Sequence, residues 1–226
     1  MEPLSRDEQL KKMEDDWDQR ARENARFYVA TGQQDWTDAE FFLSGWATVE
    51  EEILSDMTNI CQGRDPRRMK MIEIGCGMGR VTGALAEVFG EVHAVDVSSE
   101  MIDRARRALA GRSNVYLYKN NGMDLSVLPE IQFDFAFSSI VFQHIPSLEI
   151  IESYVREVHR LLRPGALFKF QVQGSTEVEL APDDTWVGVP VTDQEAVEMA
   201  LRCGFDLRYR HGAGEQYFWL WYFKKE

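Results

Sequence analysis

The first 60 residues carry helical patterning. Over residues 5–30, apolar residues recur at positions i, i+4, i+8 and i+11, and charged residues fill the other faces. A second helical stretch covers residues 38–61, and the turn-forming residues 63–66 end it. We therefore expect a helical N-terminal extension. The apolar face of its first helix consists of Trp17, Ala21, Ala25 and Tyr28.

From residue 69 onward, short apolar runs alternate with helical segments, which predicts a mostly parallel sheet covered by helices on both faces. Two runs near the C-terminus flank Gly212-Ala213-Gly214, which is typical of a hairpin. We therefore predict an α/β, doubly wound sheet with an antiparallel pair at one edge. The runs expected as strands are 69–75, 92–97, 115–119, 133–138, 166–172, 207–211 and 216–224, and the expected helices are 81–89, 98–110, 148–162 and 193–203.

The composition agrees with a folded α/β protein, and the net charge limits the kinds of partner that the protein can bind. Apolar residues make up 44% of the 226 residues, enough for a sizeable core, which excludes a disordered chain. The formal net charge is −13. Residues 1–60 hold 15 acidic and 6 basic side chains, so most of the excess lies in the extension. A surface this acidic repels phosphate backbones, so we expect a small-molecule partner and no nucleic acid.

Other features exclude further classes. No apolar run approaches the roughly 18 residues that span a bilayer, and the N-terminus lacks the apolar core of a signal peptide, so we expect a cytoplasmic protein without a membrane partner. Cys61, Cys76 and Cys203 are far apart and have no metal-ligand spacing. We expect three reduced thiols and no metal. The sequence leaves monomer and homodimer open.

The chemistry begins in the predicted turn between residues 73 and 80, which reads EIGCGMGR. Three glycines between a strand and a helix allow close approach of a ligand to the backbone and to the helix N-terminus. Asp96 ends the next strand, at a spacing suited to ribose hydroxyls. The third glycine stands at 79, whereas the dinucleotide pattern GxGxxG would need it at 80, where Arg80 stands. The acidic Glu73 favours a phosphate-free nucleoside with a zwitterionic tail.

This turn resembles motif I of the class I S-adenosylmethionine-dependent methyltransferases, and further motifs match in the family's order over residues 66–226. The resemblance implies a Rossmann-like seven-stranded sheet of order 3-2-1-4-5-7-6, with strand 7 antiparallel, and S-adenosylmethionine as cofactor. It also implies that residues 1–65 form a helical lid and residues 66–226 the methyltransferase core. The matching segments are 95–98 for motif II, 121–125 for the adenine loop, 133–138 for motif IV and 160–165 for the turn before strand five.

The resemblance implies specific cofactor contacts. Asp96 would bind the ribose, and the Met123 N–H and the Asp124 carboxylate would bind the adenine edge, with loop capping as the less favoured alternative for Asp124. Arg80 would either close over the cofactor or pair with a carboxylate. The full set of expected cofactor-binding residues is Tyr28, Glu73, Gly75, Cys76, Gly77, Gly79, Arg80, Asp96, Val97, Met101, Gly122, Met123, Asp124 and Ser138.

The catalytic candidates follow motif IV. A neutral imidazole of His144 would accept a proton from the acceptor as it attacks, and Gln143 would orient the acceptor; the plainer alternative is that both only pack the loop. Lys169 and Gln171 are further candidates to face the acceptor, against the simpler interpretation of a buried strand. The long loop 174–191 is a candidate functional segment.

We therefore expect a methyltransferase that moves a methyl group to a small molecule, at a hydroxyl oxygen, by in-line displacement. Two other functions stay open at this point. The first is methylation of a protein side chain or terminus, which needs an open groove. The second is a S-adenosylmethionine-binding protein without transfer chemistry, because a fold does not fix a function.

Overall fold

The computed structural model describes residues 4–177 and 185–225. The chain divides into two compact units, Glu14–Lys119 and Met1–Met13 with Asn120–Glu226. The predicted division into a lid and a core at residue 66 is a different, functional division, and it stays a prediction.

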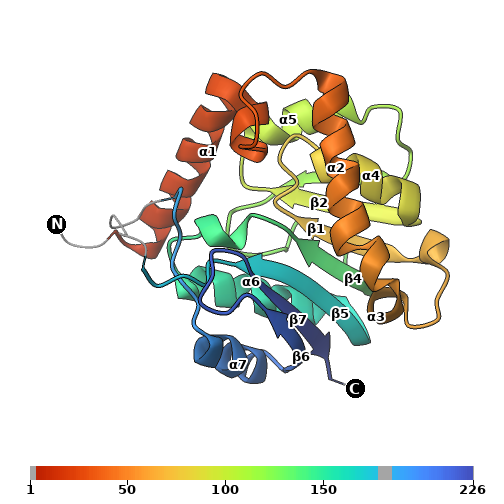
Figure 1. Ribbon diagram of the computed structural model, residues 1–226, viewed down its shortest axis with the longest axis vertical. Helices are drawn as coiled ribbons and strands as arrows, with labels where there is room; N and C mark the ends of the chain where they lie inside the picture. The colour runs from red at the N-terminus through yellow and green to blue at the C-terminus, as the bar shows by residue number, and fades with distance from the viewer. Residues whose placement is uncertain (1–3, 178–184, 226) are drawn as a thin grey trace. The chain divides into compact units, whose positions relative to one another are not determined.

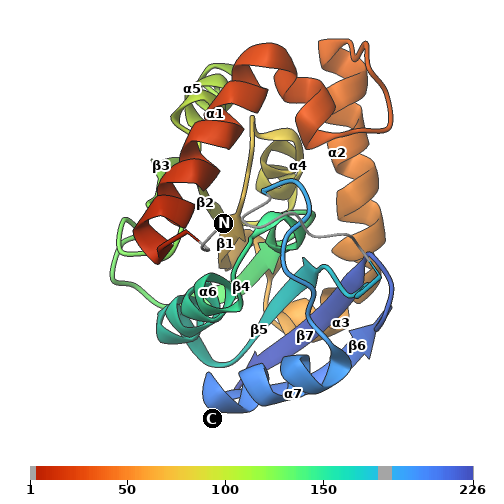
Figure 2. The ribbon, with the colours of Figure 1, turned by 90° about the vertical axis from the view of Figure 1, so that its left-hand side faces the viewer.

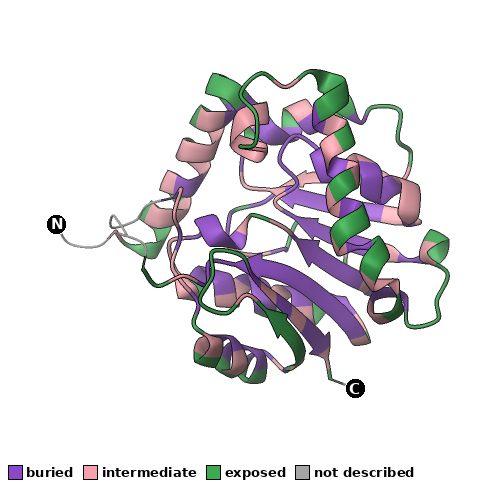
Figure 3. Cartoon of the chain, in the orientation of Figure 1, coloured by how far each residue is buried: buried purple, intermediate pink, exposed green. Residues whose placement is uncertain are grey.

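The Glu14–Lys119 unit combines three parallel strands with helices (Figure 1). Its sheet register pairs Ile72 of β1 with His93 of β2, and His93 with Tyr116 of β3. The interior of β1 and β2 is buried, because both faces of a central parallel sheet are covered (Figure 3). The elements are most of α1 (Arg6–Val29), α2 (Asp38–Glu52), η1 (Leu54–Asp56), α3 (Met57–Cys61), η2 (Pro66–Arg68), β1 (Lys70–Ile74), α4 (Arg80–Val88), β2 (Glu91–Asp96), α5 (Ser99–Ala108) and β3 (Val115–Lys119).

The second unit holds the other four strands. β4 and β5 are parallel, whereas β7 pairs antiparallel with both β5 and β6. Helix α7 lies beside the β6–β7 hairpin (Figure 2), and the Tyr222 hydroxyl of β7 donates a hydrogen bond to the Ala196 carbonyl of α7. The elements are β4 (Phe133–Ser138), η3 (Phe142–His144), α6 (Leu148–Leu161), β5 (Leu162–Val172), α7 (Asp193–Arg202), β6 (Phe205–His211) and β7 (Phe218–Lys224).

The sheet has seven strands in the order β3-β2-β1-β4-β5-β7-β6. The predicted fold class, strand order and antiparallel strand 7 are therefore confirmed. The three cysteines are buried free thiols. Along residues 4–177 and 185–225, no helix combines the length and apolar character needed to cross a membrane.

Two expected elements differ from the structure. The helix expected over residues 38–61 breaks at the fully buried Ile53, and neither glycine nor proline marks that break in the sequence. Strand β5 starts at Leu162, four residues earlier than expected. Helix α6 does end before residues 163–165, but these residues already belong to β5, where Arg163 donates to Asp134 of β4 (Nε to Oδ1, 3.1 Å) beside an irregular start of the strand pair.

Candidate functional site

The glycine turn between β1 and α4 is held to the neighbouring strand. The N–H groups of Gly75 and Cys76 both donate to the Val95 carbonyl, at 2.8 and 3.0 Å. Gly75, Gly77 and Gly79 all have positive φ, a region that side chains disfavour. Helix α4 starts directly after Gly79, and no side chain caps it. The turn thus presents an uncapped helix N-terminus, where the helix dipole favours electron-rich groups.

Two of these glycines are also required by packing. A Cβ on Gly77 would lie 2.9 Å from Cγ2 of Val29, at the end of α1. A Cβ on Gly79 would lie 2.7 Å from Cδ1 of Leu109, which follows α5. The N-terminal extension therefore packs directly on the glycine turn within the Glu14–Lys119 unit.

Asp96 lies at the end of β2 beside the turn. Its Oδ2 accepts the Gly77 N–H at 2.8 Å, and its Oδ1 accepts the Ser98 N–H at 2.9 Å. Burial raises the pKa of Asp96 to about 6, and the nearby Asp18 acts in the same direction. Each carboxylate oxygen has a second lone pair, so Asp96 can bind the turn and accept from a ligand hydroxyl.

Glu73 is the second carboxylate of the turn. Its side chain is 4% exposed, and Oε2 has no hydrogen-bond partner among the described residues. Burial raises the pKa of Glu73 to about 7. A buried carboxylate oxygen without a partner is costly to ionise, and a donor or a cation would stabilise it. This environment suits the positively charged end of a ligand.

Arg80 makes hydrogen bonds to the N-terminal extension, and its two expected roles, closing over the cofactor and pairing with a carboxylate, stay predictions. Its Nη1 donates to the Ser44 carbonyl at 3.0 Å and to the Thr48 hydroxyl at 3.1 Å, both on α2. Burial lowers the pKa of this guanidinium. Helices α2 and α4 are in close contact at Gly45, where a Cβ would lie 2.0 Å from the Arg80 carbonyl oxygen. Arg80 therefore connects the glycine turn to the N-terminal extension.

The predicted apolar face of α1 packs as expected at three of its four positions. Trp17, Ala21 and Ala25 belong to one cluster with Met78 of the glycine turn and Met101 of α5. Tyr28 is absent from it, because non-helical torsion angles at Asn24 interrupt α1 (φ −162°, ψ 82°). The Tyr28 hydroxyl instead donates to Oε2 of Glu23 at 3.0 Å. Val97 follows Asp96 and is half-buried.

The loop expected to bind adenine is capped by its own side chains. Asn121 Oδ1 accepts the N–H groups of Met123 and Asp124 at 3.0 and 2.9 Å. The Asp124 carboxylate accepts from Asn121 Nδ2 and from the Ser126 hydroxyl. Partial burial raises the pKa of Asp124, but these hydrogen bonds outweigh it and hold the pKa below its usual value. Adenine binding through the Met123 N–H would need the Asn121 hydrogen bond to open. Gly122 has a positive φ within this loop.

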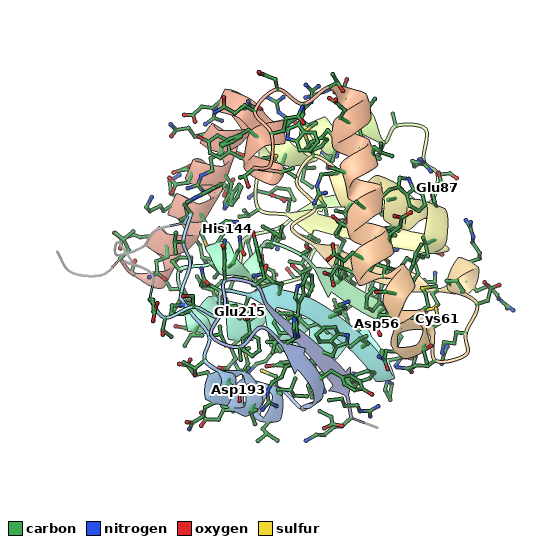
Figure 4. All side chains as sticks on the ribbon, viewed as in Figure 1. Asp56, Cys61, Glu87, His144, Asp193 and Glu215 are labelled. Atoms are coloured by element: carbon green, nitrogen blue, oxygen red, sulfur yellow. The ribbon has the colours of Figure 1, made fainter. Side chains whose placement is uncertain are left out.

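The catalytic candidates lie on the short helix η3, which follows the fully buried Ser138 at the end of β4 (Figure 4). His144 is 7% exposed, and its Nδ1 lies 2.5 Å from the Trp186 carbonyl oxygen. A carbonyl only accepts, so Nδ1 carries a proton, and in a neutral ring the lone pair then lies on Nε2. Gln143 Nε2 lies 3.3 Å from that Nε2.

A strap over residues 186–191, the last part of the loop 174–191, holds this pair through contacts that the sequence did not reveal. The Gly188 N–H donates to the Gln143 carbonyl at 2.7 Å, and the Val189 N–H donates to the Ile145 carbonyl at 2.9 Å. A Cβ on Gly188 would lie 2.4 Å from the Ile145 carbonyl oxygen. Tryptophan and glycine in a long loop were the only signal. Residues 178–184 of that loop lie outside the described residues.

Two buried polar side chains of β5 have separate roles. Lys169 is 2% exposed, and its Nζ lies 4.7 Å from the Trp221 ring centre and 5.4 Å from that of Trp219. Gln171 is fully buried and donates through Nε2 to Gln143 Oε1 at 2.9 Å. Gln171 therefore belongs with the η3 pair, whereas Lys169 belongs with the tryptophans.

The sheet order and the glycine turn define a Rossmann-like fold of the methyltransferase type. The family described as "Methyltransferase domain" matches residues 72–170. Sterol methyltransferase-like 1 of Botryococcus braunii is 27% identical over 85% of this chain and 54% of its own length. The malonyl-[acyl-carrier protein] O-methyltransferase of Enterobacter lignolyticus is 31% identical over 46% and 39%, respectively. The solved structure of DhpI in complex with SAH is similar with a TM-score of 0.64 at 20% identity, covering 96% of this chain and 97% of that one.

The chain spans about half the length of the curated relatives it matches. The family match covers β1 to β5, the part that carries the glycine turn, Asp96 and η3. Residues 72–170 therefore match a methyltransferase domain, in a sheet with the strand order of the Rossmann-like class I methyltransferase fold.

Proposed function

We propose that this protein transfers the methyl group of S-adenosylmethionine to a hydroxyl oxygen of a small molecule, and that His144 accepts the hydroxyl proton. The observation that carries the proposal is the hydrogen bond between His144 Nδ1 and the Trp186 carbonyl. This bond leaves the lone pair on Nε2, which is the state a general base needs at neutral pH.

The glycine turn fits the cofactor. Three glycines with positive φ and the uncapped N-terminus of α4 leave the backbone open to close approach. We assign the ribose hydroxyls to Asp96, whose oxygens are already aligned by the Gly77 and Ser98 N–H groups. We assign the charged amino acid end to the environment of Glu73, whose Oε2 has no hydrogen-bond partner in the described part of the chain. The remaining residues of the expected set stay predictions.

The bound cofactor supplies a methyl group on a sulfonium, which is already electrophilic. The protein therefore has to orient the acceptor, exclude water and remove one proton. Orientation alone contributes up to about 7–11 kcal/mol in well-aligned reactions. A positioned base adds about 10²–10⁴-fold for a hydroxyl acceptor. His144 and Gln143 are 7% and 6% exposed, which limits water at this position.

The charge supports a small acceptor. With a net charge of −13, the protein repels nucleic acid, and the named relatives include methyltransferases of sterol type and of a malonyl carrier protein. The second of those names describes a protein-borne acceptor. The test must therefore include free hydroxyl compounds and carrier-bound acyl groups.

The experiment is methyl transfer from labelled S-adenosylmethionine to a panel of small hydroxyl compounds, carrier-bound acids and intact proteins. On the acceptor found, we expect His144→Gln to slow single-turnover transfer by about 10²-fold or more while leaving SAH affinity unchanged. His159→Gln is the matched control, because it makes the same substitution at a histidine of α6 that packs against Phe205 and does not belong to η3. If His144→Gln transfers the methyl group at the wild-type rate, His144 is not the general base. If only intact proteins become labelled, the acceptor is a protein and the proposed small-molecule acceptor is wrong.

A further inference from the structure

A chain of buried side-chain hydrogen bonds runs from Ile140, just after β4, to the strap. Gln171 Oε1 accepts the Ile140 N–H at 3.1 Å, and Gln171 Nε2 donates to Gln143 Oε1 at 2.9 Å. Gln143 Nε2 reaches His144 Nε2 at 3.3 Å, and His144 Nδ1 reaches the Trp186 carbonyl. Gln171, Gln143 and His144 are all at least nine-tenths buried.

Backbone groups fix the direction of every hydrogen bond in this chain. The Ile140 N–H only donates, so the Gln171 atom facing it must be the oxygen. The carbonyls of Val172 and Gln216, at 2.7 and 3.2 Å from Gln171 Nε2, only accept, so the other end of this amide must be the nitrogen. Gln171 therefore has a single possible orientation.

The orientation of the Gln171 amide determines the orientation of the Gln143 amide. Because Gln171 presents N–H to Gln143, the Gln143 atom facing it must be the acceptor Oε1, and the Gln143 amide nitrogen must face the imidazole. The Gln143 N–H occupies the lone pair of Nε2 and disfavours a proton there, so the acceptor hydroxyl has to take its place on this lone pair before His144 can act as a base. The Trp186 carbonyl requires the proton on Nδ1, so both ends of the chain select the same tautomer.

The backbone of Ile140, at the start of this hydrogen-bond chain, has a strained conformation. Ile140 has φ +56°, a conformation that β-branched residues rarely adopt. Its N–H is the group that Gln171 Oε1 accepts. Strained residues of this kind persist where surrounding contacts over-determine them, and they concentrate at functional sites.

We propose that Gln171 is a positioning residue for His144: by fixing the Gln143 amide, it keeps the lone pair of the imidazole on Nε2. The proposal rests on the proposed function for calling His144 a base. The hydrogen-bond chain itself is independent of methyl transfer, so the two are tested separately.

The test is ¹⁵N NMR of the imidazoles in the full chain, with the His144 signals assigned from His144→Gln. We expect the wild type to show His144 protonated at Nδ1 and unprotonated at Nε2 at neutral pH. In Gln171→Met the Gln143 amide is free to turn its oxygen toward the ring. The fraction of His144 carrying a proton on Nε2 then rises by roughly fivefold, the ratio expected for one ordinary hydrogen bond.

A double-variant cycle separates positioning from a merely structural role. If Gln171 acts through Gln143, Gln171→Met has no further effect on the His144 signals in a Gln143→Met background. The matched control is Gln173→Met, which removes a buried glutamine directly after β5 whose Oε1 accepts the Ser175 N–H. We expect wild-type His144 signals in this control.

Three outcomes would overturn the proposal: a wild-type His144 protonated at Nε2, unchanged signals in a folded Gln171→Met, or an equal effect of Gln171→Met without Gln143. The first needs only the wild type, so the proposal stays testable if Gln171→Met does not fold. If the NMR result is as expected but His144→Gln transfers methyl at the wild-type rate, the base role fails and the positioning chain stands.

Discussion

At the scale of single residues, Glu73 is a buried carboxyl group whose Oε2 has no hydrogen-bond partner among the described residues. Burial raises its pKa to about 7, whereas in the unfolded chain it lies near 4.5. Between these values the folded state binds more protons than the unfolded state. The stability that the protonated group contributes is therefore complete below about pH 4.5 and is lost as the pH rises through about 7.

Glu73→Gln should remove that loss. Without ligand, we expect the variant to exceed the wild type in unfolding free energy by about 3 kcal/mol at pH 8 and to match it near pH 4. Urea unfolding across this pH range measures the difference. Glu91→Gln is a control of opposite sign, because the hydrogen bond from Lys70 lowers the pKa of Glu91. An unchanged pH profile in Glu73→Gln would show that burial does not shift this carboxyl.

At the scale of elements, the joint between α2 and α4 decides how the extension meets the glycine turn. Gly45 brings α2 against the first residue of α4, and Arg80 closes the contact with hydrogen bonds to Ser44 and Thr48. Figure 1 shows the two helices side by side. An added Cβ at Gly45 meets backbone, which cannot move aside as a flexible side chain does.

We therefore expect Gly45→Ala to lower the unfolding free energy by about 1–3 kcal/mol, although alanine is the better helix former. Gly32→Ala is the matched control, because a Cβ there meets nothing within 4 Å, and it should stay within about 0.5 kcal/mol of the wild type. Chemical denaturation of both variants makes the comparison. Equal stability of the two would mean that α2 and α4 do not cross this closely.

The elements also show how far sequence reasoning reaches. A capping residue marks some element boundaries in the sequence, as Ser98 marks the start of α5 with its side chain on the Met101 N–H. Pro164 and Gly165 misled, because β5 already begins at Leu162. The break at Ile53 carries no such residue and was missed. The glycine turn was predictable because its torsion angles demand glycine. The strap was not, because its hydrogen bonds to η3 are made by main-chain groups that any sequence offers.

At the scale of the whole molecule, cofactor binding can be tested without assigning it to particular residues. A ligand that binds only the folded chain stabilises it by mass action, whichever residues bind it. Thermal unfolding with ligand therefore tests the cofactor assignment for the molecule as a unit, before any acceptor is known.

We expect SAH and S-adenosylmethionine, each at about 100 times its Kd, to stabilise the fold by about 2.7 kcal/mol. For a chain of 226 residues this is a shift in Tm of roughly 5–11 °C. Asp96→Ala should lose the shift, because both the ribose acceptor and the hydrogen bond to the Gly77 N–H disappear. His144→Gln should keep it, because His144 is assigned to the acceptor. A full Tm shift in Asp96→Ala would show that Asp96 does not bind the ribose. No shift in a folded wild type would contradict cofactor binding, and the base His144 and its positioning residue Gln171 would then need another substrate.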